Sequence, residues 1–272
     1  MNHTTFALGD GIFANATLTT YVHAQKKDCP HAPRAAMLVL PGGGYSFCSS
    51  REAEPIALAY MQAGLNAYVL HYSVEEKAKF PQPLLEASRA MKYIRDHAAE
   101  DNTDPSRVFV IGFSAGGHLA SSLATCWHRA DIQAAAGVTG EENKPTGAIL
   151  SYAVISGGVN RHQGTICRAC GKSEPTDEER APFSNELNVS EHTPPCFLWH
   201  TANDAAVPVQ NSLLMAAALT EQKIPYELHI FPNGPHGLSL CTEETSVGNP
   251  ILINPQAAMW LPLSITWLQS FT

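Results

Sequence analysis

The segment around Ser114 constrains the fold of this chain more than any other part of the sequence. A short β-branched, apolar run at 108–111 leads into Gly112-Phe113-Ser114-Ala115-Gly116, and helix-forming residues follow at once. The pattern G-x-S-x-G between a strand and a helix is typical of a nucleophile elbow, where a sharp turn strains the serine and presents its hydroxyl. Small residues two positions either side allow neighbouring backbone to approach closely. The sequence therefore predicts an exposed, reactive hydroxyl between a strand and a helix.

The rest of the chain alternates between apolar strands and helices. Strands are expected at 17–23, 35–40, 66–72, 107–111, 147–154, 196–200 and 225–231, and helices at 52–63, 83–99, 115–127, 209–222 and 255–271. Nearly continuous apolar strands separated by helices are typical of a parallel sheet that helices cover on both faces. We therefore predict an α/β fold with a mostly parallel, doubly wound sheet.

Length and composition favour one domain. The chain has 272 residues, of which 44% are apolar and 15% charged, so a sizeable core is available. We expect residues 1–272 to form a single domain without a large cap. The segment 156–193 is polar and has no regular periodicity, and it is expected to be a small irregular excursion near the edge that carries the reactive groups.

Charge and hydropathy argue against several kinds of partner. The net charge of −8 speaks against nucleic acid, because phosphate binding needs a basic face. No apolar run approaches the ~20 residues of a membrane span. The first ten residues lack the basic and apolar regions of a secretion signal. The sequence therefore predicts a cytoplasmic protein without a membrane partner, and it leaves open whether the protein forms a homo-oligomer.

The seven cysteines are an odd number, scattered along the chain, which is typical of free thiols in a cytosolic protein. Cys167 and Cys170 form the one C-x-x-C pair, with only His162 close by in the sequence. A structural zinc or a redox pair is the alternative, but no second pair follows. We interpret the two as loop cysteines and predict no metal site.

A serine nucleophile needs an adjacent base, and the base needs an acid that fixes its tautomer. In a doubly wound sheet these groups lie on loops at the carboxyl ends of strands. Asp204 is the acidic residue on the loop after the strand 196–200, and His236 follows the strand that ends at Phe231. The alternative for Asp204 is a turn or cap residue. The order Ser, Asp, His favours Ser114, Asp204 and His236 as nucleophile, acid and base.

The other histidines fit structural roles better. Three of them, His71, His200 and His229, fall inside expected strands, which favours packing or surface positions. His118 lies one turn after Ser114 on the expected helix, where helix packing or a local hydrogen bond is the favoured interpretation.

The glycine run Gly42-Gly43-Gly44 follows the strand 35–40 directly. Successive glycines can aim backbone N–H groups into a cleft at little steric cost. The N–H groups of Gly43 and Gly44 are therefore candidate oxyanion donors. The N–H of Ala115 is a third candidate, because Ala115 directly follows Ser114. A nucleotide phosphate loop is disfavoured, because G-x-G-x-x-G is absent and no acidic residue ends the strand 66–72.

Together these segments resemble the α/β-hydrolase superfamily. The matching motifs are Pro41-Gly-Gly-Gly-Tyr45, Gly112-Phe-Ser-Ala-Gly-Gly-His118, His200-Thr-Ala-Asn-Asp204 and Pro235-His-Gly237. They are most similar to serine esterases related to hormone-sensitive lipase and to bacterial acetyl-xylan and feruloyl esterases, over roughly residues 35–271. Pro41 stands where the lipases carry the histidine of His-Gly-Gly-Gly, and their large N-terminal cap is missing.

The resemblance implies a serine carboxylesterase that works by two-step acyl transfer through Ser114, His236 and Asp204, with no cofactor. Little apolar surface is available to bury a long chain, at ~0.8 kcal/mol per methylene, so we expect short acyl groups. The resemblance suggests acetyl esters, including those of sugars or xylan fragments, as the small-molecule substrate. Tyr45 and Phe113 flank the oxyanion region and are candidate substrate-pocket residues, with a core position as the alternative.

Two other functions remain open from the sequence. A serine peptidase of the same fold would use the same three residues, but it usually carries a propeller or acidic groups for a free amino end. A non-catalytic binding protein on the same scaffold would be expected to have lost one of the three positions. A dehalogenase or epoxide hydrolase would need aspartate in place of Ser114.

Overall fold

The computed structural model describes residues 1–26, 28 and 30–271. Within these residues one sheet has the strand order β1-β2-β4-β3-β5-β6-β7-β8. The strands are β1 (Asn2–Ala7), β2 (Thr17–Val22), β3 (Arg34–Leu40), β4 (Asn66–His71), β5 (Thr103–Phe113), β6 (Ala148–Ser151), β7 (Cys196–Thr201) and β8 (Tyr226–Phe231). Strands β1 and β2 pair antiparallel, and every pairing from β4 to β8 is parallel. The predicted mostly parallel sheet is confirmed.

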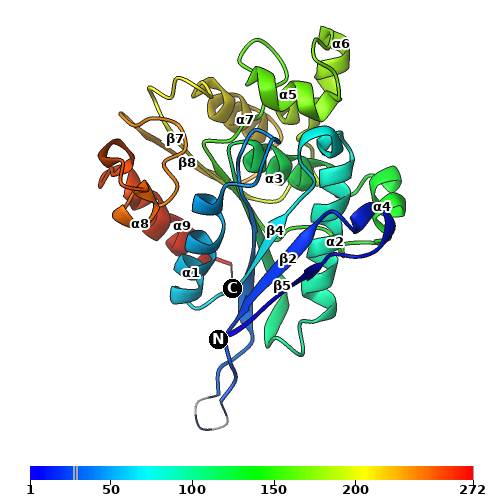
Figure 1. Ribbon diagram of the computed structural model, residues 1–272, viewed down its shortest axis with the longest axis vertical. Helices are drawn as coiled ribbons and strands as arrows, with labels where there is room; N and C mark the ends of the chain where they lie inside the picture. The colour runs from blue at the N-terminus through cyan, green and yellow to red at the C-terminus, as the bar shows by residue number, and fades with distance from the viewer. Residues whose placement is uncertain (27, 29, 272) are drawn as a thin grey trace.

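Helices cover both faces of this sheet (Figure 1). One face carries α1 (Glu54–Gln62) and α9 (Trp260–Gln269), and the other carries α2 (Gln82–Asp96), α3 (Ala115–Cys126), α4 (Ala130–Ala136) and α7 (Gln210–Glu221). Successive side chains of a strand point to opposite faces. Accordingly Met37 and Val39 of β3 pack on the α1 side, whereas Leu38 and Leu40 pack on the α2 side. Burial on both sides explains why the central strands are apolar throughout.

The differences between the structure and the expected elements include β1, α4 and the start of β5. Strand β1 is largely exposed and polar, so it lacks the apolar alternation that marks a half-buried strand. Helix α4 is a short alanine-rich segment that the sequence analysis also missed. Strand β5 begins at Thr103, although Asp104-Pro105 suggests a turn; the Ser106 amide donates to Asp104 Oδ1 at 2.9 Å. The pairing with β3 shifts register there, which accommodates the turn-like residues as a bulge.

The sequence predicts an irregular segment at 156–193, but the structure contains short helices there. They are α5 (Gln163–Cys170), α6 (Asp177–Arg180) and the 3₁₀ turns Ala181–Phe183 and Asn185–Asn188. Their ends carry recognisable caps: the His162 side chain caps α5, Gly171 ends it with a positive φ, and Thr176 with Glu179 forms a capping box on α6. In Figure 1, α5 and α6 lie at the end of the molecule farthest from the N-terminus.

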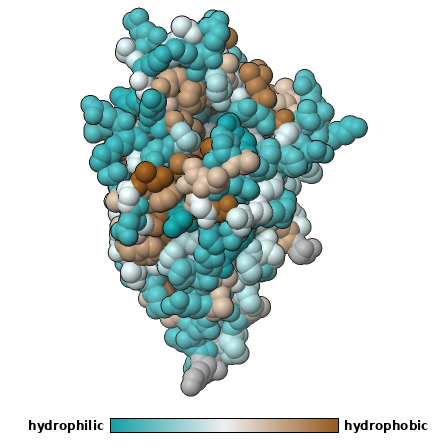
Figure 2. All heavy atoms as spheres, turned by 90° about the vertical axis from the view of Figure 1, so that its right-hand side faces the viewer, coloured by the Kyte–Doolittle hydropathy of each residue, from teal (hydrophilic) through white to brown (hydrophobic). Residues whose placement is uncertain are grey.

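The face of the molecule seen in Figure 2 is mostly hydrophilic. On the face seen in Figure 2, apolar residues gather mainly in the upper half and are surrounded by polar ones. None of the helices in the described ranges has the length and hydropathy needed to cross a membrane. The remaining short elements are α8 (Glu243–Ser246) and the 3₁₀ turns Gly11–Phe13, Ser50–Glu52 (η2), Glu75–Ala78 (η3), Pro250–Leu252 and Ala257–Met259.

Candidate active site

The turn between β5 and α3 holds Ser114 in a strained conformation. Ser114 has φ 53° and ψ −116°, a positive φ that is rare for a residue with a side chain. A Cβ atom on Gly112 would lie 2.0 Å from the Gly116 carbonyl oxygen, and one on Gly116 would lie 2.1 Å from the Leu40 carbonyl oxygen. Both flanking glycines are therefore required by the close approach of backbone, as the motif predicts.

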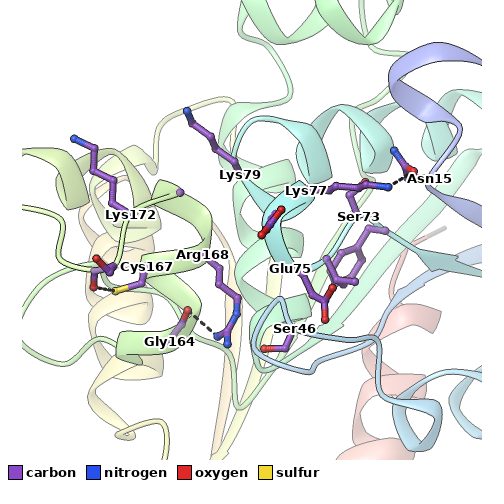
Figure 3. Close-up of a pocket in the computed structure, with 15 residues that line it drawn as sticks. Asn15, Ser46, Ser73, Glu75, Lys77, Lys79, Gly164, Cys167, Arg168 and Lys172 are labelled. Atoms are coloured by element: carbon purple, nitrogen blue, oxygen red, sulfur yellow. Dashed lines mark hydrogen bonds between the residues drawn. The ribbon is translucent and has the colours of Figure 1, made fainter.

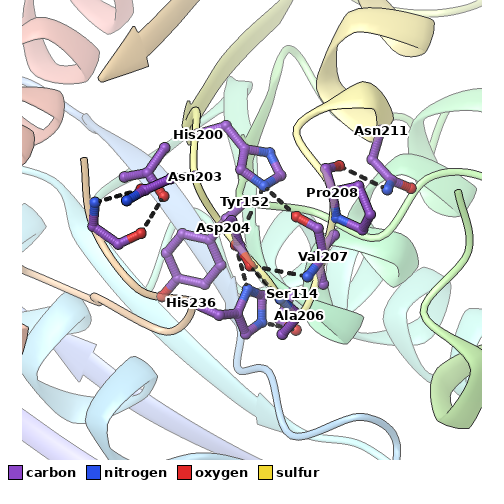
Figure 4. Close-up of polar contacts among 12 residues, drawn as sticks. Ser114, Tyr152, His200, Asn203, Asp204, Ala206, Val207, Pro208, Asn211 and His236 are labelled. Atoms are coloured by element: carbon purple, nitrogen blue, oxygen red, sulfur yellow. Dashed lines mark hydrogen bonds and ion pairs between the residues drawn. The ribbon is translucent and has the colours of Figure 1, made fainter. Parts of the chain in front are cut away.

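The structure brings together Ser114, His236 and Asp204 (Figure 4). Ser114 Oγ lies 2.8 Å from His236 Nε2, and His236 Nδ1 lies 2.7 Å from Asp204 Oδ2. The three side chains come from the segments that follow β5, β8 and β7, which end at the same edge of the parallel sheet. Because Nδ1 faces a carboxylate, the neutral ring carries its proton there and leaves Nε2 free to accept the serine proton.

Asp204 is held as a buried carboxylate. Its Oδ1 accepts the amide N–H groups of Ala206 and Val207, each at 2.9 Å, and its Oδ2 faces both His236 and His200. Burial would raise the pKa of Asp204, but the hydrogen bonds from His200 and His236 outweigh it and hold the pKa well below its usual range. The carboxylate therefore stays ionised throughout the neutral range.

His200 is a contact of the site that sequence reasoning missed. The sequence favours a packing or surface position for it, and the structure buries it fully in β7. Its Nε2 lies 2.9 Å from the Val207 carbonyl and 3.3 Å from Asp204 Oδ2, while its Nδ1 lies 2.8 Å from Ser212 Oγ. Two acceptors at Nε2 mean that the proton is on Nε2. The sequence feature that could have identified His200 is its position near the end of the strand, four residues before Asp204.

The glycine loop lies against the elbow. A Cβ atom on Gly42 would lie 3.0 Å from the Cβ of Ser114, and the Gly42 amide donates to Glu52 Oε2 at 2.9 Å. Gly43 and Gly44 have φ of +127° and +64°, which a glycine adopts without strain. Within the described part of the chain, the amides of Gly43, Gly44 and Ala115 donate no hydrogen bond. The backbone donors predicted at these three positions are therefore unpaired in the described residues, and the loop that carries Gly43 and Gly44 begins beside Ser114.

A buried carboxylate, Glu52, links the glycine loop to the loop of His236. Besides accepting the Gly42 amide, Glu52 accepts the Tyr152 hydroxyl through Oε1 at 2.6 Å. The same Tyr152 oxygen accepts the amide of Ser239 at 2.9 Å, and the Tyr152 ring lies 5.1 Å from the His236 ring. Glu52, Tyr152 and Ser239 thus form a brace between the two loops. The sequence does not reveal this brace, because Tyr152 and Ser239 follow Glu52 by about one hundred and about two hundred residues, and no local pattern marks them.

Tyr45 and Phe113 do not line a substrate pocket, which corrects the expectation for both. Each side chain is fully buried. The Phe113 ring packs edge-on against Trp260, on the α9 side of the sheet, and the Tyr45 hydroxyl contacts His118 Nδ1 at 3.0 Å. Both residues are core residues that support the loops carrying them, so neither can contact a substrate directly.

His118 makes the local hydrogen bonds that the sequence favoured. It is fully buried, with Nδ1 against the Tyr45 hydroxyl and Nε2 3.0 Å from the Phe183 carbonyl. It thereby ties the end of the glycine loop to the segment 156–193. Burial lowers the pKa of His118 to about 4, although the Phe183 hydrogen bond opposes the shift.

We expect this buried imidazole to make the fold sensitive to acid. The folded pKa lies below the ordinary 6.5, so the unfolded chain binds the proton more readily between pH 6.5 and about 4. The contribution of neutral His118 to the free energy of unfolding is complete above pH 6.5. It decreases by about 3 kcal/mol as the pH falls towards 4. Urea unfolding of the wild type and of His118→Gln at several pH values measures this loss of stability. A difference in unfolding free energy between the two that stays constant with pH would contradict this assignment.

The C-x-x-C pair lies in helix α5, not in a loop as expected. Cys167 Sγ donates to the Ser173 carbonyl at 3.0 Å, and Cys170 Sγ to the Glu179 carbonyl at 3.7 Å. Six cysteines are free thiols; Cys29 lies outside the described residues. Across those residues, no three histidine, cysteine or acidic side chains gather closely enough to hold a metal ion.

Taken together, a strained serine after β5, an acid after β7 and a histidine after β8, on a mostly parallel sheet, define an α/β hydrolase. Comparison with known proteins agrees. A crystal structure of MGS-M1, an α/β hydrolase from a deep-sea metagenome of the Medee basin, matches 99% of this chain and 97% of its own, with a TM-score of 0.81 and 36% identity. More particularly, the chain belongs to the BD-FAE family, whose model matches residues 22–219.

Two curated relatives are longer proteins. The chain is 42% identical to endo-1,4-beta-xylanase B of Butyrivibrio fibrisolvens over 84% of its own length and 35% of that protein. It is 28% identical to the acetylxylan esterase of Xylanibacter ruminicola, over 78% of this chain and 43% of the relative. The chain thus spans less than half of each.

Proposed function

We propose that this chain is a serine carboxylesterase, with Ser114 as nucleophile, His236 as general base and Asp204 as the acid that orients it. The observation that carries the proposal is the continuous hydrogen-bonded series from Ser114 Oγ through both His236 nitrogens to Asp204 Oδ2. The loop that carries the unpaired amides of Gly43 and Gly44 begins beside Ser114, and Ala115, whose amide is also unpaired, follows Ser114 directly. A nucleophile, a base and anion donors in one place are what acyl transfer requires.

The reaction follows from the positions of the protons. Nε2 of His236 takes the Ser114 proton as Oγ attacks the ester carbon, and the imidazolium formed is stabilised by the Asp204 carboxylate. The carbonyl oxygen becomes an oxyanion that the three amides bind; each such donor is worth about 3 kcal/mol in the transition state. The proton then passes to the leaving alcohol, and water hydrolyses the acyl-enzyme by the same steps.

Acetyl is the acyl group that we propose. The relative named an acetylxylan esterase supports this assignment, and so does its match over most of this chain. The segment over the site, 156–193, contributes only short helices, so little apolar surface is available for a long acyl chain. Acetylated sugars, including fragments of xylan, are the proposed natural class of substrate.

A series of p-nitrophenyl esters from acetate to decanoate tests this function. We expect kcat/KM to be highest at acetate or propionate and to fall steeply beyond butyrate, because methylenes without a pocket gain none of the ~0.8 kcal/mol that burial of each would supply. An aminoacyl anilide serves as the comparison substrate. A maximum at long chains would contradict the short-acyl assignment, and faster cleavage of the anilide would favour a peptidase instead.

A further inference from the structure

Helix α5 packs directly on the glycine loop of the proposed oxyanion site. Arg168 Nη1 donates to the Gly44 carbonyl at 3.3 Å. A Cβ atom on Gly44 would lie 3.9 Å from both His162 Cε1 and Thr165 Oγ1. These three residues are spaced by three along the helix and its cap, so they share one face. That face forms a wall beside the amide that is expected to hold the ester oxygen.

The first residue of this wall, His162, has a defined tautomer. Its Nδ1 accepts the Thr165 amide at 3.3 Å and lies 2.8 Å from the Thr165 hydroxyl. Because Nδ1 acts as an acceptor, the neutral ring carries its proton on Nε2. Within the described residues Nε2 has no hydrogen-bond partner, and it is not enclosed by protein. The wall therefore presents one unpaired N–H donor.

The environment of His162 favours its neutral form. Burial lowers its pKa, and the positive charges of His236 and Arg168 lower it further, while Asp204 opposes them. Among these charges His236 has the largest effect. Because His162 contacts Gly44, its neutral imidazole lies beside the loop that is proposed to bind the ester oxygen.

A broad cavity lies on the other side of Arg168, which is the wall residue that lines it, whereas His162 and Ser114 do not (Figure 3). It has a volume of about 1220 Å³ and runs between η3 and α5. Ligand pockets typically measure about 300–1,000 Å³, so it has room for more than one sugar unit. Its lining is largely charged or hydroxylated and includes Ser46, Glu75, Lys77, Lys79, Gly164 and Arg168. These charged and hydroxyl side chains can form hydrogen bonds with an alcohol that carries several hydroxyls.

We propose that His162 is a specificity-determining residue, whose Nε2–H donates to a free hydroxyl adjacent to the ester in the leaving alcohol. The site thereby selects monoesters of vicinal diols, such as partly acylated sugars, over esters whose alcohol lacks that hydroxyl. The inference rests on the proposed esterase function and adds to it the chemical group that is recognised. Thr165 acts through His162, because it fixes the acceptor role of Nδ1.

Two substrates that differ only at the neighbouring hydroxyl test the proposal: methyl 2-O-acetyl-β-xylopyranoside and its 3-deoxy analogue. We expect the wild type to favour the free diol in kcat/KM by about tenfold, the size of one neutral hydrogen bond. His162→Asn retains a side-chain cap for α5 but cannot reach as far as Nε2, so it should abolish the preference. His162→Gln, whose amide nitrogen extends further, should restore part of it.

The control is Gln163→Ala, which changes the exposed neighbour of His162 on the same helix and should leave the ratio unchanged. A wild-type ratio near one, or equal ratios in wild type and His162→Asn, would overturn the inference. If His162→Asn fails to fold in a thermal melt, the wild-type ratio and His162→Gln still decide it. A wild type that hydrolyses neither sugar ester nor p-nitrophenyl acetate is a different result, because the proposed function itself then fails.

Discussion

Ser114→Ala is expected to lower kcat for p-nitrophenyl acetate by about 10⁵- to 10⁶-fold, the loss typical of removing a serine nucleophile. The only oxygen within hydrogen-bonding distance of His236 Nε2 in the described residues is Ser114 Oγ, so no other hydroxyl can replace it there. The variant should also lose covalent labelling by a fluorophosphonate, measured by intact mass. Alanine at a positive φ retains some strain, but the fold should persist.

The matched control is Ser50→Ala, which removes an exposed serine close to the glycine loop and should keep both activity and labelling. Circular dichroism and thermal melts establish whether each variant is folded. Residual activity of Ser114→Ala above about one per cent, in a folded protein, would contradict the assignment of the nucleophile.

Asp204→Asn is expected to lower kcat by about 10⁴-fold. The amides of Ala206 and Val207 both donate to Oδ1, so an asparagine would place its carbonyl oxygen there and its NH₂ group towards His236. Facing a donor, His236 Nδ1 becomes the acceptor and the ring proton moves to Nε2. Nε2 can then no longer accept the Ser114 proton, so the base is lost while the geometry is retained.

The readouts are steady-state kinetics at neutral pH and the rate of fluorophosphonate labelling, which should fall in parallel. Asp96→Asn, a change of an exposed aspartate on α2, is the control for removing one negative charge. If Asp204→Asn retains more than about a tenth of the wild-type rate, the acid of the site must be sought elsewhere.

The local features of the site could be predicted because short-range sterics determine them. The strand, the glycines at 112 and 116 and the helix that follows identify the elbow, since only small residues fit the contacts that this turn makes. Asp204 and His236 could be selected because each follows a strand that ends at the same edge of the sheet. The glycine loop was identified for the same reason, and its three amides are unpaired as expected.

The surroundings of these residues could not be predicted in the same way. Helix α5 has end caps, but its sequence does not reveal that it packs on Gly44. His200 resembles any buried strand histidine until the loop after β7 brings Asp204 back against it. Tyr45 and Phe113 are adjacent to site residues in the sequence, yet both are buried in the core. Phe113 ends β5, where the alternation of the strand points it there, and Tyr45 lies in a turn with a positive φ.

The sequence alone thus determined the class of fold, the serine on the strained turn and the order of the two residues that contact it or its partner, because these depend on backbone sterics and on strand-to-loop boundaries that neighbouring residues define. Only the tertiary structure decided what surrounds them: the Glu52 brace, the second histidine on Asp204 and the position of His162 beside the glycine loop. Each of these is a contact between side chains far apart in the chain. The register of the sheet and the packing of helices across it set such distances, and no local pattern encodes them.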